Sequence, residues 1–219
     1  MKIGLFGGSF NPIHRCHLVV AESARNRLGL DAVLFVPTGD PPHKPSTEYI
    51  ASAHRLEMLK LAIAPYPYFQ VSDIELQRPT KSYSIDTVRE LRRHYPVDTE
   101  FVFVIGLDAF RELPSWKEPH ALLSSCDFAV VARAGSTFKS LQELAILQGD
   151  NITELNRIDA GEVDSVKLLL KSGRAVWALR IPPCNVSAKD IRKRVRDGAD
   201  LENALSPAVE AYFRRIAIS

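Results

Sequence analysis

Cysteine is scarce in this sequence, with three in 219 residues: Cys16, Cys126 and Cys184. They are odd in number, lie far apart and form no CxxC pair. This usage argues against a disulfide framework and for a reducing compartment. We therefore expect a cytoplasmic protein without structural disulfides.

Long apolar runs and a strong excess of charge are also lacking. No apolar stretch approaches the roughly 20 residues that a transmembrane helix needs, so no membrane partner is expected. The net charge of +2 is too small to indicate a nucleic-acid partner. Lys2 leads directly into an apolar run and a glycine turn, which is not the pattern of a signal peptide.

Apolar runs alternate with segments of helical spacing, and the length suits one α/β domain with a sizeable core. Strands are expected over 2–6, 32–37, 69–74, 100–105, 127–132 and 175–181. Helices are expected over 12–28, 51–64, 84–95, 187–196 and 206–216, and two further helical stretches, 138–148 and 162–172, flank a polar link at 149–161. This alternation predicts a doubly wound parallel sheet with helices on both faces and ligands beyond the carboxyl ends of its strands.

The loop after the first strand contains a glycine pair and a predicted helix start. Gly7 and Gly8 let the backbone turn tightly and approach a ligand closely. Asn11 followed by Pro12 predicts an N-cap and the first helical residue. That start would direct free backbone N–H groups and the positive end of the helix dipole at an anion.

His14 and His17 lie three residues apart and therefore share one face of the predicted helix. The loop is neither a Walker A motif, because no GK[ST] follows the glycines, nor a GxGxxG motif. Phosphate binding is favoured, while an incidental surface pair and a metal site remain open. A zinc site would need three or four ligands, and no other Cys/His cluster supplies them.

A second helix start with basic residues lies near the other end of the sequence. Ser187 can cap a helix over 188–197, with Asp190 completing an approximate capping box. Arg192 and Lys189 project from its first turn, and arginine binds phosphate oxygens through two hydrogen bonds. The alternative is a solvated basic face, which we expect for Lys193, Arg194 and Arg196.

Three further residues follow strands or lie in loop-like contexts. Asp108 comes after the most apolar predicted strand, where an acid commonly binds a ribose hydroxyl or caps a loop. Trp116 and Tyr83 could stack on an electron-poor ring, although a loop tryptophan more often packs on the core.

Six segments, in order along the chain, resemble bacterial nicotinate-nucleotide adenylyltransferases of the nucleotidylyltransferase superfamily. Residues 7–17 are similar to the (T/H)xGH motif of that superfamily. In two places the sequence departs from the pattern, with Cys16 where glycine is usual and Lys189 where threonine is usual. The other five segments are Pro41-Pro42-His43-Lys44, Ser82-Tyr83-Ser84-Ile85-Asp86-Thr87, Gly106-Leu107-Asp108 with Leu113-Pro114-Ser115-Trp116, Ala132-Arg133-Ala134-Gly135, and Val186-Ser187-Ala188-Lys189-Asp190-Ile191-Arg192.

The resemblance implies a Rossmann-like single domain, with a core over 1–183 and C-terminal helices over 184–219 that carry the second phosphate motif. It implies adenylyl transfer from ATP to nicotinate mononucleotide, with release of pyrophosphate and formation of nicotinate adenine dinucleotide. Mg²⁺ would arrive with ATP, held chiefly by phosphates and water rather than by a protein cluster. The chain could act as a monomer or a homo-oligomer.

The resemblance also implies roles for individual residues. The catalytic residues would be His14, His17 and Arg192. ATP would be bound by Gly7, Gly8, Ser9, Phe10, His14, His17, Gly106, Asp108, Ser187 and Arg192. Nicotinate mononucleotide would be bound by His43, Lys44, Tyr83, Ser84, Asp108, Trp116 and Arg133.

Three alternatives remain open. The acceptor could be nicotinamide mononucleotide or phosphopantetheine instead. A non-catalytic nucleotide sensor is disfavoured by the intact histidine pair. A tRNA-synthetase fragment is disfavoured because no anticodon-binding domain is evident.

Overall fold

A seven-stranded sheet forms the centre of the protein, which we describe from a computed structural model over residues 1–40, 50–132 and 135–217. The strand order is β3-β2-β1-β4-β5-β7-β6, and every neighbouring pair is parallel except β6 and β7. The predicted parallel sheet is thus confirmed, with an antiparallel strand added at one edge. The strands are β1 (Lys2–Gly8), β2 (Ala32–Pro37), β3 (Phe69–Val71), β4 (Glu100–Gly106), β5 (Asp127–Val131), β6 (Ser165–Leu169) and β7 (Ala175–Leu179).

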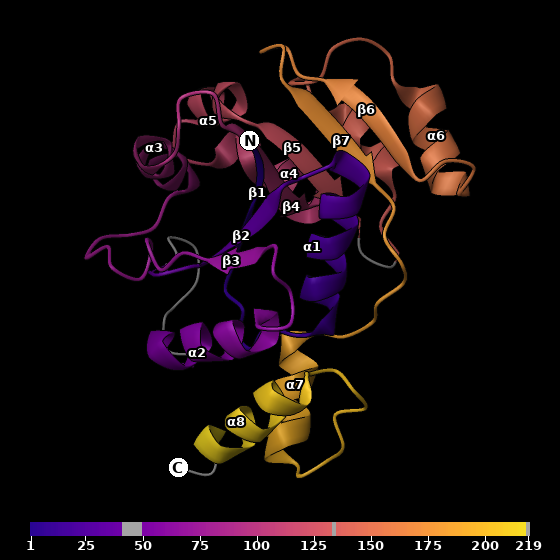
Figure 1. The fold of residues 1–219 in the computed structure, drawn as a ribbon. Helices are drawn as coiled ribbons and strands as arrows, with labels where there is room; N and C mark the ends of the chain where they lie inside the picture. The colour runs from indigo at the N-terminus through magenta and orange to yellow at the C-terminus, as the bar shows by residue number, and fades with distance from the viewer. Residues whose placement is uncertain (41–49, 133–134, 218–219) are drawn as a thin grey trace.

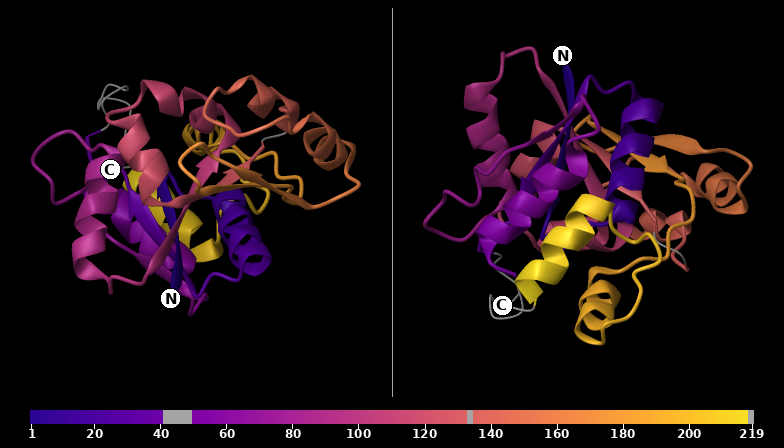
Figure 2. Two further views of the ribbon diagram at one scale, coloured as in Figure 1. Left: turned by 90° about the horizontal axis from the view of Figure 1, so that it is seen from above. Right: turned by 60° about the horizontal axis from the view of Figure 1, so that its bottom comes forward.

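Helices cover both faces of this sheet (Figures 1 and 2). The α-helices are α1 (Arg15–Leu28), α2 (Ser52–Ile63), α3 (Ser84–His94), α4 (Leu107–Glu112), α5 (Pro119–Ser125), α6 (Ile152–Ala160), α7 (Ala188–Arg196) and α8 (Pro207–Ala217), and two 3-10 helices are η2 (Leu113–Ser115) and η3 (Phe138–Glu143). In β4, Phe103 packs with the α3 side of the core, whereas its neighbours Val102 and Val104 pack with the α1 side. This alternation of side chains between faces buries the strand completely, as a doubly wound sheet requires.

The region between β5 and β7 differs from the prediction. The expected helix over 162–172 is wrong, because β6 occupies its centre and pairs with β7. Val166 and Leu168 are buried and alternate with exposed neighbours, which is the period of a half-buried strand. The helix α6 lies instead within the expected polar link at 149–161, where Leu155 and Ile158 fill one face and Gly161 ends it.

The two C-terminal helices lie beneath α1 and α2 (Figure 1). Ile191 of α7 and Phe213 of α8 are buried in the same hydrophobic cluster as α1 and α2. His54 of α2 and the Tyr212 hydroxyl of α8 share a hydrogen bond of 2.9 Å. The C-terminal segment therefore packs on the core and brings its basic helix near the first loop. Among the described residues, no helix combines the length and the apolar character needed to cross a membrane.

Candidate active site

The site lies at the carboxyl ends of the central strands, where the prediction placed it. β1 and β4 are parallel neighbours, with Phe6 paired to Val104. The loop after Gly8 and the turn after Gly106 therefore lie side by side, at the carboxyl ends of these two central strands. This placement lets residues about 100 positions apart in the sequence bind one ligand.

The first loop reaches its helix later than expected. α1 begins at Arg15, with His14 as its N-cap in an extended conformation, so the predicted start at Pro12 is wrong. Asn11 does not cap the helix, because its side-chain oxygen accepts a hydrogen bond from the Ile50 amide at 2.9 Å. The Asn11–Pro12 peptide bond is cis. Three residues of irregular backbone thus stand where the first helical turn was predicted.

The rings of the two histidines lie against each other at the start of α1, with centroids 3.8 Å apart and planes tilted by 33°. The His14 amide donates a hydrogen bond to Nδ1 of His17 at 3.2 Å. With Nδ1 as the acceptor, a neutral His17 carries its proton on Nε2, which makes that nitrogen a hydrogen-bond donor. The structure therefore confirms the predicted pairing, although through the helix cap rather than through one face of a helix that is already formed.

The side chain of Phe10 belongs to the hydrophobic core rather than to the surface of the loop. Its side chain is buried at 1% exposure and packs edge-on against Phe6, with centroids 5.6 Å apart. Its ring is also the reason for Gly8, because a Cβ there would lie 3.2 Å from it. Phe10 anchors the loop, so any nucleotide contact it makes would have to come from its backbone.

Arg55 of α2 is a buried residue beside the first loop that the sequence analysis missed. Its guanidinium donates to the carbonyl oxygens of Ser9 (2.8 Å), Thr38 (2.8 Å) and Ile50 (3.0 Å). These hydrogen bonds fix the loop backbone against α2 and the end of β2. The sequence contained one clue to its burial. Arg55 lies four residues before Leu59, on the helix face that packs into the core.

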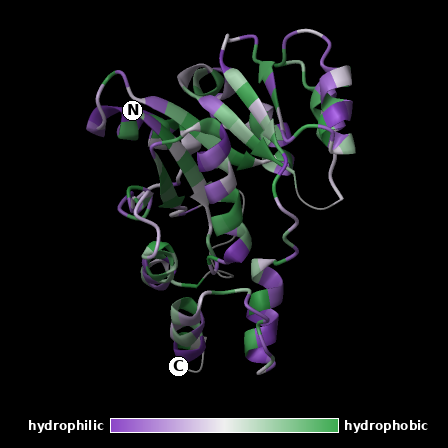
Figure 3. Cartoon of the chain, turned by 45° about the vertical axis from the view of Figure 1, so that its right-hand side comes forward, coloured by the Kyte–Doolittle hydropathy of each residue, from purple (hydrophilic) through white to green (hydrophobic). Residues whose placement is uncertain are grey.

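The basic helix α7 meets the first loop directly. Ser187 is its N-cap, as predicted, and its hydroxyl accepts a hydrogen bond from the Asp190 amide at 3.1 Å. The Arg192 guanidinium donates to the Asn11 carbonyl oxygen at 2.6 Å. Two motifs that are about 180 residues apart in the sequence are therefore in contact. Figure 3 shows the largely hydrophilic character of this helix.

A disulfide joins the same two regions. Cys16 in the first turn of α1 is bonded to Cys184, with Cα atoms 5.5 Å apart. The expectation of no disulfide is therefore wrong, because a separation of 168 residues concealed a pair that the fold brings together. Cys126 is free and buried, and burial raises the pKa of its thiol to about 12.

Asp108 lies in the first turn of α4, directly after β4, and is exposed. Its side chain folds back over Gly106, since a Cβ at Gly106 would lie 2.6 Å from Oδ1 of Asp108. Glycine at 106 thus leaves room for the Asp108 carboxylate in this position.

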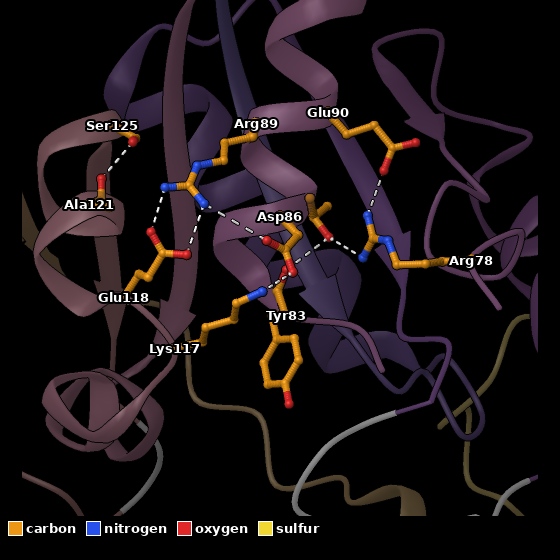
Figure 4. Close-up of polar contacts among 10 residues, drawn as sticks. Arg78, Tyr83, Asp86, Arg89, Glu90, Lys117, Glu118, Ala121 and Ser125 are labelled. Carbon is orange, nitrogen blue, oxygen red and sulfur yellow. Dashed lines mark hydrogen bonds and ion pairs between the residues drawn. The ribbon is translucent and has the colours of Figure 1, made fainter. Parts of the chain in front are cut away.

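Tyr83 and Trp116 come from two segments that an ion pair connects (Figure 4). Tyr83 is the N-cap of α3, Ser84 its first residue, and Trp116 ends η2. Nζ of Lys117 lies 2.8 Å from Oδ2 of Asp86 and 4.8 Å from the centroid of the Tyr83 ring. Both aromatic side chains are partly buried against the core. The predicted ring-binding residues therefore lie on two segments that are held together.

Comparison with known proteins decides the family. Residues 5–194 match the family model described as cytidylyltransferase-like. This chain belongs to the cytidylyltransferase-like family.

Relatives within the family are similar over almost their whole length. A probable nicotinate-nucleotide adenylyltransferase of Citrifermentans bemidjiense is 41% identical, over 98% of this chain and 96% of the relative. One from Thermoanaerobacter sp. is 35% identical, over 98% and 92%. Among solved structures, Plasmodium falciparum nicotinic acid mononucleotide adenylyltransferase complexed with NaAD has a TM-score of 0.71 at 17% identity, covering 98% of this chain and 95% of that one. The resemblance noted in the sequence is thus confirmed.

Not every predicted site residue can be placed in this cytidylyltransferase-like chain. His43, Lys44 and Arg133 lie outside the described residues. Within the described ranges, no group of three or more His, Cys, Asp or Glu side chains could hold a metal ion.

A buried acid lies behind the α3 start of this cytidylyltransferase-like fold. Glu75 is 8% exposed and accepts a hydrogen bond from the Thr87 hydroxyl at 2.7 Å. Desolvation raises its pKa above the ordinary 4.5, although Thr87, Arg78 and the Gly39 amide act in the opposite direction. The folded protein therefore binds this proton more tightly than the unfolded chain.

Glu75 gives a pH-dependent contribution to stability that can be measured. Because its folded pKa is raised, its favourable contribution is complete below about pH 4 and is lost as the pH rises through the folded pKa. We expect the stability of Glu75→Gln relative to wild type to increase between about pH 4 and 7. Urea unfolding at several pH values tests this, with Glu100→Gln at an exposed position as the control. A difference between Glu75→Gln and wild type that does not change with pH would contradict it.

Proposed function

We propose that this chain transfers the adenylyl group of ATP to nicotinate mononucleotide, giving nicotinate adenine dinucleotide and pyrophosphate in NAD biosynthesis. One observation carries the proposal. The Arg192 side chain reaches the backbone of the first loop and so unites the Ser187–Arg192 motif with the histidine pair. Both lie near the carboxyl end of β4, which Asp108 follows, and relatives named probable nicotinate-nucleotide adenylyltransferase are similar over almost the whole chain.

The chemistry needs alignment and charge stabilisation rather than an activated nucleophile. The attacking group is the phosphate of the mononucleotide, which is already anionic and requires no general base. It attacks the α-phosphorus of ATP, and the bond to the pyrophosphate oxygen breaks. Donors positioned around the phosphates lower the barrier as negative charge shifts toward the leaving group.

His14, His17 and Arg192 are proposed as the catalytic donors. Nε2 of His17 carries a proton when Nδ1 accepts from the His14 amide, so it can donate to a phosphate oxygen. Arg192 and Ser187 would hold the β- and γ-phosphates from the start of α7. The proposed ATP-binding set also contains Gly7, Gly8, Ser9, Phe10, Gly106 and Asp108.

The acceptor site is proposed on the other side of Asp108. Trp116 and Tyr83 would stack on the pyridine ring, and Ser84 at the start of α3 would receive its carboxylate. Asp108 would bind a ribose hydroxyl. His43 and Lys44 would bind the mononucleotide phosphate, and Arg133 would lie near the substrates.

Three broader features belong to this proposal. ATP would act with a divalent metal, for which we propose Mg²⁺, held mainly by phosphates and water. The whole chain would act as one domain, because the C-terminal helices share a hydrophobic cluster with α1 and α2. A cytoplasmic location is proposed from the substrates, since the cysteine argument for it no longer holds.

The acceptor assay tests the function. Pyrophosphate release is measured with ATP and each of nicotinate mononucleotide, nicotinamide mononucleotide and phosphopantetheine. We expect kcat/KM to be at least about tenfold higher for the nicotinate acceptor, because a site built for a carboxylate leaves donors unpaired when the amide binds. A preference for another acceptor, or no turnover with any of the three, would overturn the proposal.

Trp116→Ala should raise KM for nicotinate mononucleotide up to about tenfold, because an aromatic stacking contact contributes roughly 0.5 to 1.5 kcal/mol. KM for ATP should stay within about twofold. Trp116→Phe retains a ring and is the matched control, with most of the affinity restored. An equal rise in KM for both substrates would show that Trp116 supports the core and does not bind the acceptor.

A further inference from the structure

The Cys16–Cys184 disulfide joins the two proposed phosphate motifs at their ends. Cys16 immediately precedes His17 in the first turn of α1. Cys184 lies three residues before Ser187, the N-cap of α7. The bond therefore attaches the end of the first motif covalently to the segment that leads into the second.

The segment that carries Cys184 has little else to hold it. Residues 181–186 connect β7 to α7 without regular secondary structure. In the described part of the chain, their backbone makes no hydrogen bond to other residues. Ile181 and Val186 pack partly against the core, while Pro182 and Pro183 are exposed. The disulfide is thus the main constraint on the approach to Ser187.

We propose that the Cys16–Cys184 disulfide is a reversible positioning cross-link, whose reduction loosens the start of α7 and weakens ATP binding. The inference rests on the proposed assignment of both motifs to the ATP phosphates. Ser187 and the first residues of α7 would then have to be ordered when ATP binds instead of beforehand. Ordering one or two side chains on binding corresponds to about a fivefold loss of affinity.

The bond is open to exchange with a dithiol reductant. Cys16 and Cys184 are both partly exposed, and Arg15 beside Cys16 is exposed. A thiolate of the dithiol attacks one sulfur to give a mixed disulfide, and its second thiol then displaces the enzyme. Cys16 and Cys184 leave as two thiols, with two electrons transferred and the dithiol oxidised. Disulfides in reducing compartments are usually transient or redox-sensing, which fits this chemistry.

The reduced protein should stay folded, because other contacts join the same regions. The Arg15 amide donates to the Ala204 carbonyl oxygen at 2.9 Å, and Arg192 holds the Asn11 carbonyl. Ile191 remains buried at 1% exposure. The effect of reduction is therefore local to the approach to α7.

The test compares the full-length enzyme before and after treatment with dithiothreitol. Thiol labelling and mass spectrometry of the native protein should count no reactive thiol before reduction and two after it, because Cys126 is buried. KM for ATP should rise about fivefold on reduction, with KM for nicotinate mononucleotide and kcat within about twofold. Reoxidation should restore the original KM.

Variants separate this effect from general damage. Cys16→Ser and Cys184→Ser should both show the KM of the reduced enzyme and no response to dithiothreitol. Cys126→Ala is the matched control and should respond as the wild type does.

Two results would overturn the inference. The first is a KM for ATP that is the same in both redox forms, and the second is two reactive thiols before any reductant is added. Either could occur while His17→Ala still lowers kcat and Arg192→Ala still lowers kcat/KM for ATP by about 10²-fold, so the cross-link can fail without the site assignment failing. If those two variants kept full activity, the assignment itself would fail.

Discussion

Replacing His17 with alanine should lower kcat by about 10²-fold or more, which is the typical loss when one donor to a developing oxyanion is removed. Nε2 of His17 is the proton-bearing nitrogen because the His14 amide occupies Nδ1. The substitution removes a hydrogen-bond donor whose effect is largest in the transition state, when negative charge moves to the pyrophosphate leaving group. Steady-state pyrophosphate release at saturating substrates measures it.

A matched histidine gives the control for this experiment. His94 is exposed at the end of α3, away from the first loop, and His94→Ala should stay within about twofold of wild type. A His17→Ala enzyme within threefold of wild type would remove His17 from the mechanism. Unfolding temperatures should be similar for both variants, because His17 is only partly buried.

Arg192→Ala should lower kcat/KM for ATP by about 10²-fold, since a charge-assisted pair to phosphate is lost where the two motifs meet. Arg192→Lys should recover only part of this, because an ammonium group lacks the planar pair of donors. Arg196→Ala, on the exposed side of the same helix, should have little effect.

Calorimetry distinguishes phosphate binding by Arg192 from its contact with the Asn11 carbonyl. If Arg192 binds the β- and γ-phosphates, Arg192→Ala lowers the affinity for ATP at least about tenfold. The affinity for AMP, which lacks those phosphates, stays within twofold. Equal weakening of both nucleotides would mean that Arg192 acts only by holding the first loop.

The central part of the fold was predictable because its signals are local. Runs such as Ala32–Pro37 are continuously apolar, and the structure has β2 over the same residues. Ser187 was predictable as a cap because a hydroxyl three residues before a helical carboxylate is a local pattern.

The errors arose where distant contacts decide the local structure. Asn11 binds the Ile50 amide instead of capping a helix, and no local pattern shows that. Cys16 and Cys184 meet only after the sheet has formed. β6 resembles a helix in composition, but it pairs with β7 at the sheet edge, so tertiary pairing outweighed helix propensity.

Candidate residues for the site could be selected from the sequence one by one, but their arrangement could not. The histidine pair, Asp108 and Arg192 could be selected from sequence because their residue types and spacing suit phosphate and ribose. Arg55 could not, since its role is to bind backbone carbonyls that the fold brings together. Cys16, which departs from the family pattern, is explained by its bond to Cys184.

The central claim is that motifs from opposite ends of the chain hold the phosphates of one nucleotide. A crystal structure with a non-hydrolysable ATP analogue tests it most directly. We expect one triphosphate within hydrogen-bond distance of both Nε2 of His17 and the guanidinium of Arg192, with a ribose beside Asp108. A triphosphate that contacts only one of the two motifs would contradict it.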